Sequence, residues 1–123
     1  MRCAFVEPDD LARGEPLPGW AGRFFSTAGM TFASYEIAAD AQPLHEHRHP
    51  QEEVWTVLEG ELAFTIDGLE RVVGPGAAAV IPSGVPHSAR PLGPCRALVV
   101  DQPQRAEVGG VKIPTAVDEP GET

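Results

Sequence analysis

Glycine and proline interrupt this chain so often that little room is left for long regular elements. The sequence has 13 of each among 123 residues, without a collagen-like period. Such frequent breaks favour short strands joined by tight turns. Between the breaks, apolar and β-branched residues recur at strand length, at the spacing of roughly 8–12 residues typical of sandwiches and barrels. The strands expected on this basis span 30–39, 53–58, 61–67, 69–73, 77–81, 87–90 and 96–101.

The pattern therefore predicts an all-β protein, and no stretch shows a convincing helical period. Two of its turns are expected to close hairpins. One is Glu59-Gly60, and the other is Asp67-Gly68, a dipeptide that favours a positive-φ turn.

At this length the chain is expected to be a single domain, 1–123. Its barrel core should lie at about 23–101. Before the core we expect a loop-like N-terminal arm at 1–22, with a candidate edge strand at 3–6. After the core, residues 102–123 are polar and contain several glycines and prolines, so a poorly ordered C-terminal tail is expected.

Acidic residues outnumber basic ones by 18 to 9, which gives a formal net charge of −9. A surface this acidic argues against nucleic acid and anionic membranes as partners, because both require basic patches. No apolar stretch approaches the roughly 18–20 residues that span a bilayer. The N-terminus carries acidic residues and proline where a signal peptide has its apolar core, so we expect a cytoplasmic protein. Its two cysteines, Cys3 and Cys95, are then expected to be reduced.

All four histidines fall in two short segments, and this clustering is the strongest functional signal in the sequence. In the first segment, His45, His47 and His49 share one parity with Glu53, so in an extended chain their side chains point to one face. Imidazoles with a carboxylate form a mixed nitrogen–oxygen site, which suits one divalent ion of iron, manganese, nickel, copper or zinc. Glu52 has the opposite parity and is expected to face solvent. A surface or structural role is the alternative for any single histidine.

The second segment supplies a further ligand. His87 follows a turn stiffened by two prolines (PSGVPH), which would fix how it enters the cavity of a barrel. We therefore predict a metal site formed by His47, His49, Glu53 and His87. Three imidazoles and one carboxylate leave coordination positions open, as catalytic or substrate-binding metals require. Two roles stay open for His45, that of a solvated loop residue and that of a pocket residue behind the ligands.

These residues resemble the two motifs of the cupin superfamily. The first motif, G-x5-H-x-H-x3,4-E-x6-G, matches from His47 to Gly60, with an alanine in place of the leading glycine. The second, G-x5-P-x-G-x2-H-x3-N, matches from Gly76 to His87, with a proline in place of the final asparagine. Neither departure touches a predicted ligand, and the resemblance extends over about 30–101.

The resemblance implies a double-stranded β-helix, or jelly-roll barrel, of the small single-domain bacterial type. The same four residues would hold the metal in the mouth of the barrel, facing a small-molecule ligand or substrate. Cupins of this size commonly form homodimers, often by adding an N-terminal strand to the neighbouring sheet. Residues 3–6 are the candidate strand here.

Because one fold hosts many chemistries, three functions stay open. The first is a metal-dependent enzyme acting on a small oxygen-rich molecule, of the dioxygenase, isomerase or lyase type. Within this class, HRHPQEEVWTVLEGEL and RALVVDQPQR resemble the small cupins of pectin breakdown, which open unsaturated uronate sugars. The second stretch lacks the aromatic residue and paired prolines that those proteins have before the arginine. The other two functions are a non-catalytic module that binds or senses a small ligand, and a structural metal site.

No catalytic residue is assigned from the sequence, but several side chains are candidates for the pocket wall. They are His45, Tyr35, Trp55 and Phe64, with Phe32, Ser34, Val57 and Val80 as further wall positions. Arg71 and Arg90 are either at the mouth, where they would meet a substrate carboxylate, or solvated on the surface. Trp55 could stack on a substrate ring, whereas core packing is the competing interpretation for the other apolar residues.

Overall fold

A computed structural model describes residues 4–116, and their regular elements are strands apart from one turn of 3-10 helix, η1 (Pro8–Asp10). The strands are β1 (Ala12–Gly14), β2 (Trp20–Ser26), β3 (Thr31–Ile37), β4 (Leu44–His47), β5 (Glu52–Glu59), β6 (Leu62–Ile66), β7 (Leu69–Val73), β8 (Ala78–Ile81), β9 (His87–Pro91), β10 (Cys95–Gln102), β11 (Glu107–Val108) and β12 (Val111–Lys112). All seven expected strands are present, with ends within two residues of those predicted, whereas β1, β2 and β4 were not anticipated. Within 4–116, no helix is long and apolar enough to cross a membrane.

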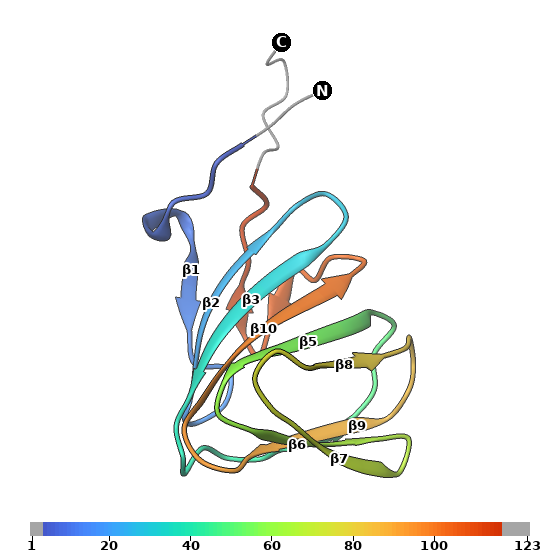
Figure 1. The fold of residues 1–123 in the computed structure, drawn as a ribbon. Helices are drawn as coiled ribbons and strands as arrows, with labels where there is room; N and C mark the ends of the chain where they lie inside the picture. Colours follow the sequence, from blue (N-terminus) through green and yellow to red (C-terminus); the bar gives the residue numbers. More distant parts are fainter. Residues whose placement is uncertain (1–3, 117–123) are drawn as a thin grey trace.

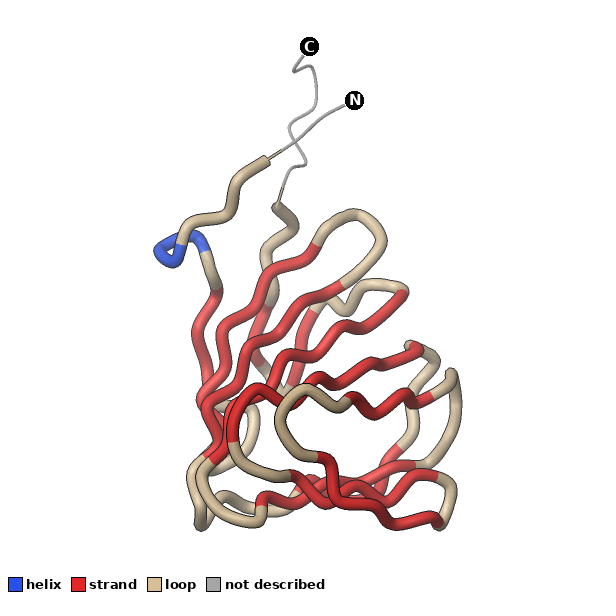
Figure 2. Tube along the Cα trace, viewed as in Figure 1, coloured by secondary structure: helices blue, strands red, loops and turns tan. Residues whose placement is uncertain are grey.

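Two antiparallel sheets carry the fold. The larger has six strands in the order β1-β2-β3-β10-β5-β8, and the smaller has four in the order β4-β9-β6-β7. In Figures 1 and 2 the smaller sheet lies across the lower end of the larger one. The buried apolar side chains of both sheets form one core cluster. The arrangement is a jelly roll, which confirms the all-β prediction.

Strict alternation of inward and outward residues builds the core. β2 and β3 bury every second residue, so that their apolar side chains face the smaller sheet. The inward rings of Trp20, Tyr35, Trp55 and Phe64 then contact one another, with centroids 5.4 to 6.1 Å apart. These contacts fix Trp55, and with it the strand that carries Glu53.

The predicted hairpin at Glu59-Gly60 is wrong. β5 pairs with β10 and β8, whereas β6 pairs with β7 and β9, so the chain crosses from one sheet to the other at this point. Gly60 has φ 74°, and a side chain there would lie 2.3 Å from the Pro94 carbonyl oxygen. The glycine thus permits a tight crossing between sheets, which looks the same in sequence as a hairpin turn. The hairpin at Asp67-Gly68 is confirmed, with both residues at positive φ.

The two ends of the chain are more ordered than expected. β1 pairs with β2 inside the stretch predicted as a loop-like arm, while residues 4–6 form no strand and Cys3 lies outside the described residues. The C-terminal segment is not a loose tail as far as residue 116. β11 and β12 pair, Ile113 is buried, and Thr115 bridges to Ser26. The physical reason is that Val108, Val111 and Ile113 give this polar segment an apolar side that packs on the barrel.

Candidate metal centre

The predicted ligands come from three strands and one loop. His47 ends β4, His87 begins β9, and the two are cross-strand partners. Glu53 lies near the start of β5, across the barrel in the other sheet. His49 lies in the loop between β4 and β5, so its position follows from that turn and not from the strand parity used to predict it.

Backbone carbonyls orient all three imidazoles in the same way. The Nδ1 atom lies 2.8 Å from the His45 carbonyl in His47, 3.1 Å from the Gln51 carbonyl in His49, and 2.8 Å from the Val85 carbonyl in His87. A carbonyl oxygen only accepts, so Nδ1 must carry the hydrogen in each ring. Nε2 is therefore the atom available to a metal ion, which is the arrangement of a metal-binding histidine.

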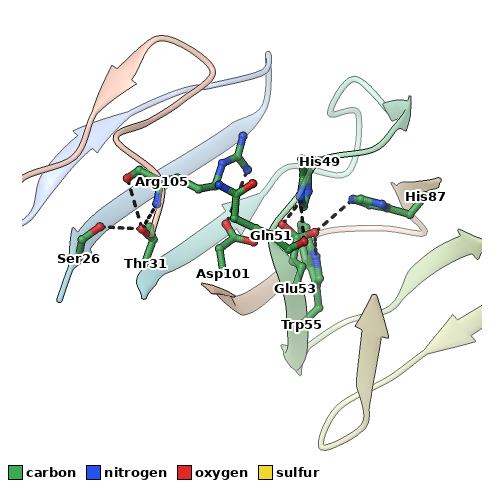
Figure 3. A network of polar contacts seen from close by, with 9 residues as sticks. All are labelled: Ser26, Thr31, His49, Gln51, Glu53, Trp55, His87, Asp101 and Arg105. Atoms are coloured by element: carbon green, nitrogen blue, oxygen red, sulfur yellow. Dashed lines mark hydrogen bonds and ion pairs between the residues drawn. The ribbon is translucent and has the colours of Figure 1, made fainter. Parts of the chain in front are cut away.

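The Glu53 carboxylate lies between two of these rings (Figure 3). His49 Nε2 is 3.5 Å from Glu53 Oε2, and His87 Nε2 is 3.4 Å from Glu53 Oε1. Both nitrogens are buried and neither makes a proper hydrogen bond to any group within residues 4–116. On the outer side, the Trp55 indole donates a 2.7 Å hydrogen bond to Glu53 Oε1. This hydrogen bond holds the Glu53 carboxylate in place beside the two histidine rings.

These spacings fit a divalent metal with nitrogen and oxygen ligands. For bonds of about 2.1 Å, ligand atoms lie about 3.0 Å apart at right angles and about 3.4 Å apart at tetrahedral angles. The Nε2–carboxylate distances are close to the larger value, and the ligand nitrogens of His47, His49 and His87 lie within 4.8 Å of one another. The donor set and its two unpaired buried nitrogens therefore suit such an ion.

The charges of the site are arranged around Glu53. Burial by itself would raise the pKa of Glu53, but the neighbouring His49, His87 and Asp101 side chains and the Trp55 hydrogen bond outweigh it and hold the pKa well below its usual range. For His87, burial opposes the charged form, yet the nearby Glu53 carboxylate and the Val85 carbonyl raise its pKa. Burial lowers the pKa of His47, with further contributions from the other two imidazoles.

Asp101 and Arg105 were missed by sequence reasoning. Asp101 is buried, is the cross-strand partner of Glu53, and offers a carboxylate oxygen within 4.8 Å of ligand atoms of His49 and Glu53. Burial, followed by the neighbouring Glu53, raises its pKa. The signal was present in the sequence, because Asp101 is a charged residue at an inward position of the apolar strand RALVVD.

Arg105 stands beside this carboxyl, with Nη1 3.6 Å from Asp101 Oδ2. Its backbone is anchored by Thr31, whose hydroxyl accepts from the Arg105 amide at 2.8 Å and lies 3.3 Å from its carbonyl oxygen. Ser26 in turn hydrogen-bonds Thr31 at 2.7 Å (Figure 3). Two buried hydroxyls thus hold the backbone from which the guanidinium reaches the site.

A cavity of about 240 Å³ opens beside the ligands. Its wall combines aromatic and aliphatic side chains with the polar groups His47, Glu53, Asp101 and Arg105. Tyr35 and Trp55 line it, whereas Phe64 packs behind Trp55 and His45 is exposed outside, contributing only its carbonyl.

Several other predicted wall positions are wrong. Ala33 and Tyr35 face inward on β3, so Phe32 and Ser34 point to the outer side of the sheet. Val80 is 57% exposed, because β8 buries Ala79 and Ile81 instead. For Phe32, Ser34 and Val80 the cause is the same: a shift of one residue in strand register exchanges the two faces. Arg71 is exposed and Arg90 pairs with Glu70 on the surface, so the surface alternative holds for both arginines.

A family model described as "Cupin domain" matches residues 34–101, more than half of the chain. The chain belongs to the cupin family. Among solved structures, KdgF from Halomonas sp. superposes on this cupin with a TM-score of 0.75 at 20% identity, covering 84% of this chain and 96% of that one. At that identity the likeness supports the fold alone.

Curated relatives resemble only part of this cupin and differ in function. Dimethylsulfoniopropionate lyase DddQ of Ruegeria pomeroyi is 37% identical over 75 residues, 60% of this chain and 36% of the lyase. Quercetin 2,3-dioxygenase of Bacillus subtilis is 45% identical over 51 residues, 42% of this chain and 15% of the dioxygenase. The transcriptional regulator PuuR of Escherichia coli is 36% identical over 62 residues, 50% of this chain and 32% of the regulator. The chain thus spans about a third or less of each relative.

Proposed function

We propose that this cupin is a metal-dependent enzyme acting on a small, oxygen-rich, anionic molecule, of the dioxygenase, isomerase or lyase type. One observation carries the proposal. The imidazoles of His47, His49 and His87, each oriented by a hydrogen bond at Nδ1, gather together, and those of His49 and His87 lie beside the Glu53 carboxylate, next to a cavity of about 240 Å³. Structural metal sites are usually closed, whereas these four ligands leave positions open toward the cavity.

His47, His49, Glu53 and His87 would hold the ion. Bound there, a divalent metal supplies Lewis-acid chemistry at substrate oxygens or, for a redox-active ion, chemistry with dioxygen. With one carboxylate among the ligands, the site keeps about one positive charge, which favours an anionic substrate that offers two oxygens.

The other polar residues of the cavity have roles that follow from their positions. Arg105 would bind a substrate carboxylate, since a guanidinium presents paired donors to two oxygens. Asp101 lies between Arg105 and Glu53 and is placed to move a proton at a substrate atom held beside the metal. Burial raises the pKa of Tyr35 well above its usual value, so this cavity residue stays a hydroxyl and can donate a hydrogen bond. The neighbouring tryptophans exclude water.

Elemental analysis of the purified protein tests the metal assignment, beside two matched variants of the same segment. His49→Ala removes a predicted ligand, whereas His45→Ala removes an exposed side chain. About one equivalent of metal in the wild type and in His45→Ala, with little in His49→Ala, is the expected result. Equal metal in all three proteins, each still folded, would refute the ligand set.

Substrate access is tested on protein reloaded with cobalt or copper. Adding a chelating diketone or a 2-hydroxy acid should change the visible spectrum of the metal, because open positions accept two oxygens. Arg105→Gln should weaken the binding of the 2-hydroxy acid about ten-fold or more, because this probe has a carboxylate that meets the guanidinium. The binding of the uncharged diketone should stay the same. An unchanged spectrum with both probes would indicate a closed, structural site.

A non-catalytic binding or sensing module is the second candidate, and the resemblance to the regulator PuuR over half of this chain favours it. The two candidates differ in turnover. A panel of 2-oxo acids, diketones, flavonols and unsaturated uronates, incubated with the reloaded protein, separates them. Consumption of one compound that depends on Asp101 supports the enzyme, whereas tight binding without consumption supports the module.

A further inference from the structure

The wall of the cavity beside the metal ligands changes from polar to apolar over one step of strand register. Glu53 on β5 and Asp101 on β10 are cross-strand partners, and we call these two carboxylates the polar level. Two residues away on the same strands, Trp55 and Val99 are partners, and Val99 is also the partner of Ala33 on β3. Residues two apart on a strand face the same side, and all five line the cavity. A molecule held at the polar level therefore meets an apolar wall next to it.

Three further apolar side chains extend this wall, from segments far apart in the sequence. They are Leu17 in the loop between β1 and β2, Leu44 on β4 and Val108 on β11. Two of these segments touch, because a Cβ atom at Gly109 would lie 2.5 Å from Cβ of Pro16. All three side chains pack on the core and yet stay partly exposed. An apolar group that covers them removes their surface from water, which favours binding in proportion to the area covered.

The apolar wall offers little to the hydroxyl groups of a substrate. The indole of Trp20 donates a 2.7 Å hydrogen bond to the Gln42 carbonyl, and the indole of Trp55 donates to Glu53. Both indole N–H groups are therefore already paired. Apart from the polar level and its neighbours His47 and Arg105, only the Tyr35 hydroxyl remains among the lining side chains of residues 4–116. A molecule with several hydroxyls would leave most of them buried and unpaired here, which opposes its binding.

The size of the cavity limits the substrate further. Its volume of about 240 Å³ lies below the roughly 300–1,000 Å³ of pockets that hold drug-sized ligands. It corresponds to the space of about eight water molecules in the liquid. The cavity therefore suits a compact molecule.

We propose that the substrate is a small 2-oxo or 2-hydroxy acid whose remainder is a compact, uncharged apolar group, and that Leu17, Leu44 and Val108 select this group. The proposal rests on the function proposed above, in which the metal binds two substrate oxygens and Arg105 meets the carboxylate. That arrangement holds the polar head at the polar level and directs the remainder to the apolar wall. The unsaturated uronates considered from the sequence do not suit this wall, because their ring hydroxyls would face it.

Three acids with the same 2-hydroxy carboxylate head test the proposal on cobalt-reloaded protein. Glycolate is the head alone, 2-hydroxy-4-methylpentanoate adds a branched apolar tail, and 2,3,4-trihydroxybutanoate has as many non-hydrogen atoms but a hydroxylated tail. The change in the cobalt spectrum gives the dissociation constant of each acid. The branched acid should bind at least about ten-fold more tightly than the other two. Its heat-capacity change on binding, from calorimetry, should also be the most negative, since this quantity reports buried apolar surface.

Serine substitutions assign the preference to the wall. Val108→Ser and Leu17→Ser should each weaken the branched acid about five-fold or more and leave glycolate unchanged, because glycolate does not reach the wall. Val72→Ser is the matched control, since Val72 is 54% exposed on β7, is not part of the cavity wall, and should change neither acid. Circular dichroism checks that each variant is folded. The two wall positions belong to different segments, so either variant suffices if the other fails to fold.

The possible failures are distinguishable. If glycolate changes the cobalt spectrum but the branched and hydroxylated acids bind equally, the apolar preference is overturned while the open metal site stands. A preference that survives both wall variants would overturn the assignment of Leu17 and Val108. If none of the three acids changes the spectrum, the proposed function fails and this inference fails with it.

Discussion

At the scale of single residues, backbone carbonyls set the chemistry of this centre as much as the histidines that they orient. Three carbonyls, one from β4 and two from loops, hold three imidazoles in one tautomer. The sequence supplied the histidines and their spacing, and these predict the ligand set. It held a signal for Asp101, a charged residue in an apolar strand, but the approach of Asp101 and Arg105 to the site depends on the pairing of β10 with β5.

The binding of metal should release a proton that depends on His87. In the metal-free protein Glu53 holds the pKa of His87 above its usual value of about 6.5, so the folded state binds this proton more tightly than the unfolded state. The stabilisation of the folded state by this proton is complete below about pH 6.5 and is lost as pH rises through the raised pKa of His87. A metal ion must displace the same proton. Metal affinity should therefore rise with pH through the raised pKa and then level off.

Calorimetric titration of zinc or nickel in two buffers of different protonation enthalpy measures this release. We expect up to about one proton per ion near neutral pH and fewer above it. Protein dialysed against a chelator at pH 4.5 should hold no metal, because His87, whose pKa is raised, is then protonated and cannot bind the ion. Affinity independent of pH between 6 and 8 would contradict the assigned role of His87.

At the scale of elements, the passage of the chain from one sheet to the other at Gly60 is the feature that the pattern of apolar residues predicted least well. Gly60→Ala should lower the free energy of unfolding by about 2 kcal/mol or more, through a left-handed backbone strain of about 1 kcal/mol and a clash with the Pro94 carbonyl. Gly68→Ala is the control, since Gly68 also has positive φ but has open space around it. Gly68→Ala should lower the free energy of unfolding by about 1 kcal/mol. Urea denaturation measures both, and equal losses would show that the clash is relieved at no cost.

The C-terminal segment gives the second element-scale prediction. Ile113 is 9% exposed and packs on the barrel, so Ile113→Ala should destabilise the protein by about 2–3 kcal/mol. Glu107→Ala, at an exposed position of the same hairpin, should change stability by less than about 0.5 kcal/mol. The midpoints of urea denaturation of the two variants test this prediction. A neutral Ile113→Ala would mean that this segment contributes little to the fold, as the sequence first suggested.

At the scale of the whole molecule, the metal centre joins the two sheets. Glu53 belongs to the larger sheet, whereas His47 and His87 belong to the smaller one. An ion held by both should therefore oppose their separation on unfolding. At a free concentration one hundred times its dissociation constant, it adds about 2.7 kcal/mol, which corresponds to roughly 10 °C in Tm for a chain of this length. Scanning calorimetry with metal and with chelator measures the shift, and His49→Ala should abolish it while His45→Ala preserves it.

The sequence by itself determined the positions of seven strands, the Asp67-Gly68 hairpin, the family and the residues of the predicted ligand set. These depend on local properties: the period of apolar residues, turn dipeptides, and the spacing of chemically distinctive side chains. The tertiary structure alone decided that Glu59-Gly60 crosses between sheets, that Tyr35 and not Phe32 faces the cavity, and that Asp101 and Arg105 join the metal centre. All three depend on which strands pair and in which register. Register is set by contacts distant along the chain, and a shift of one residue exchanges the two faces of a strand.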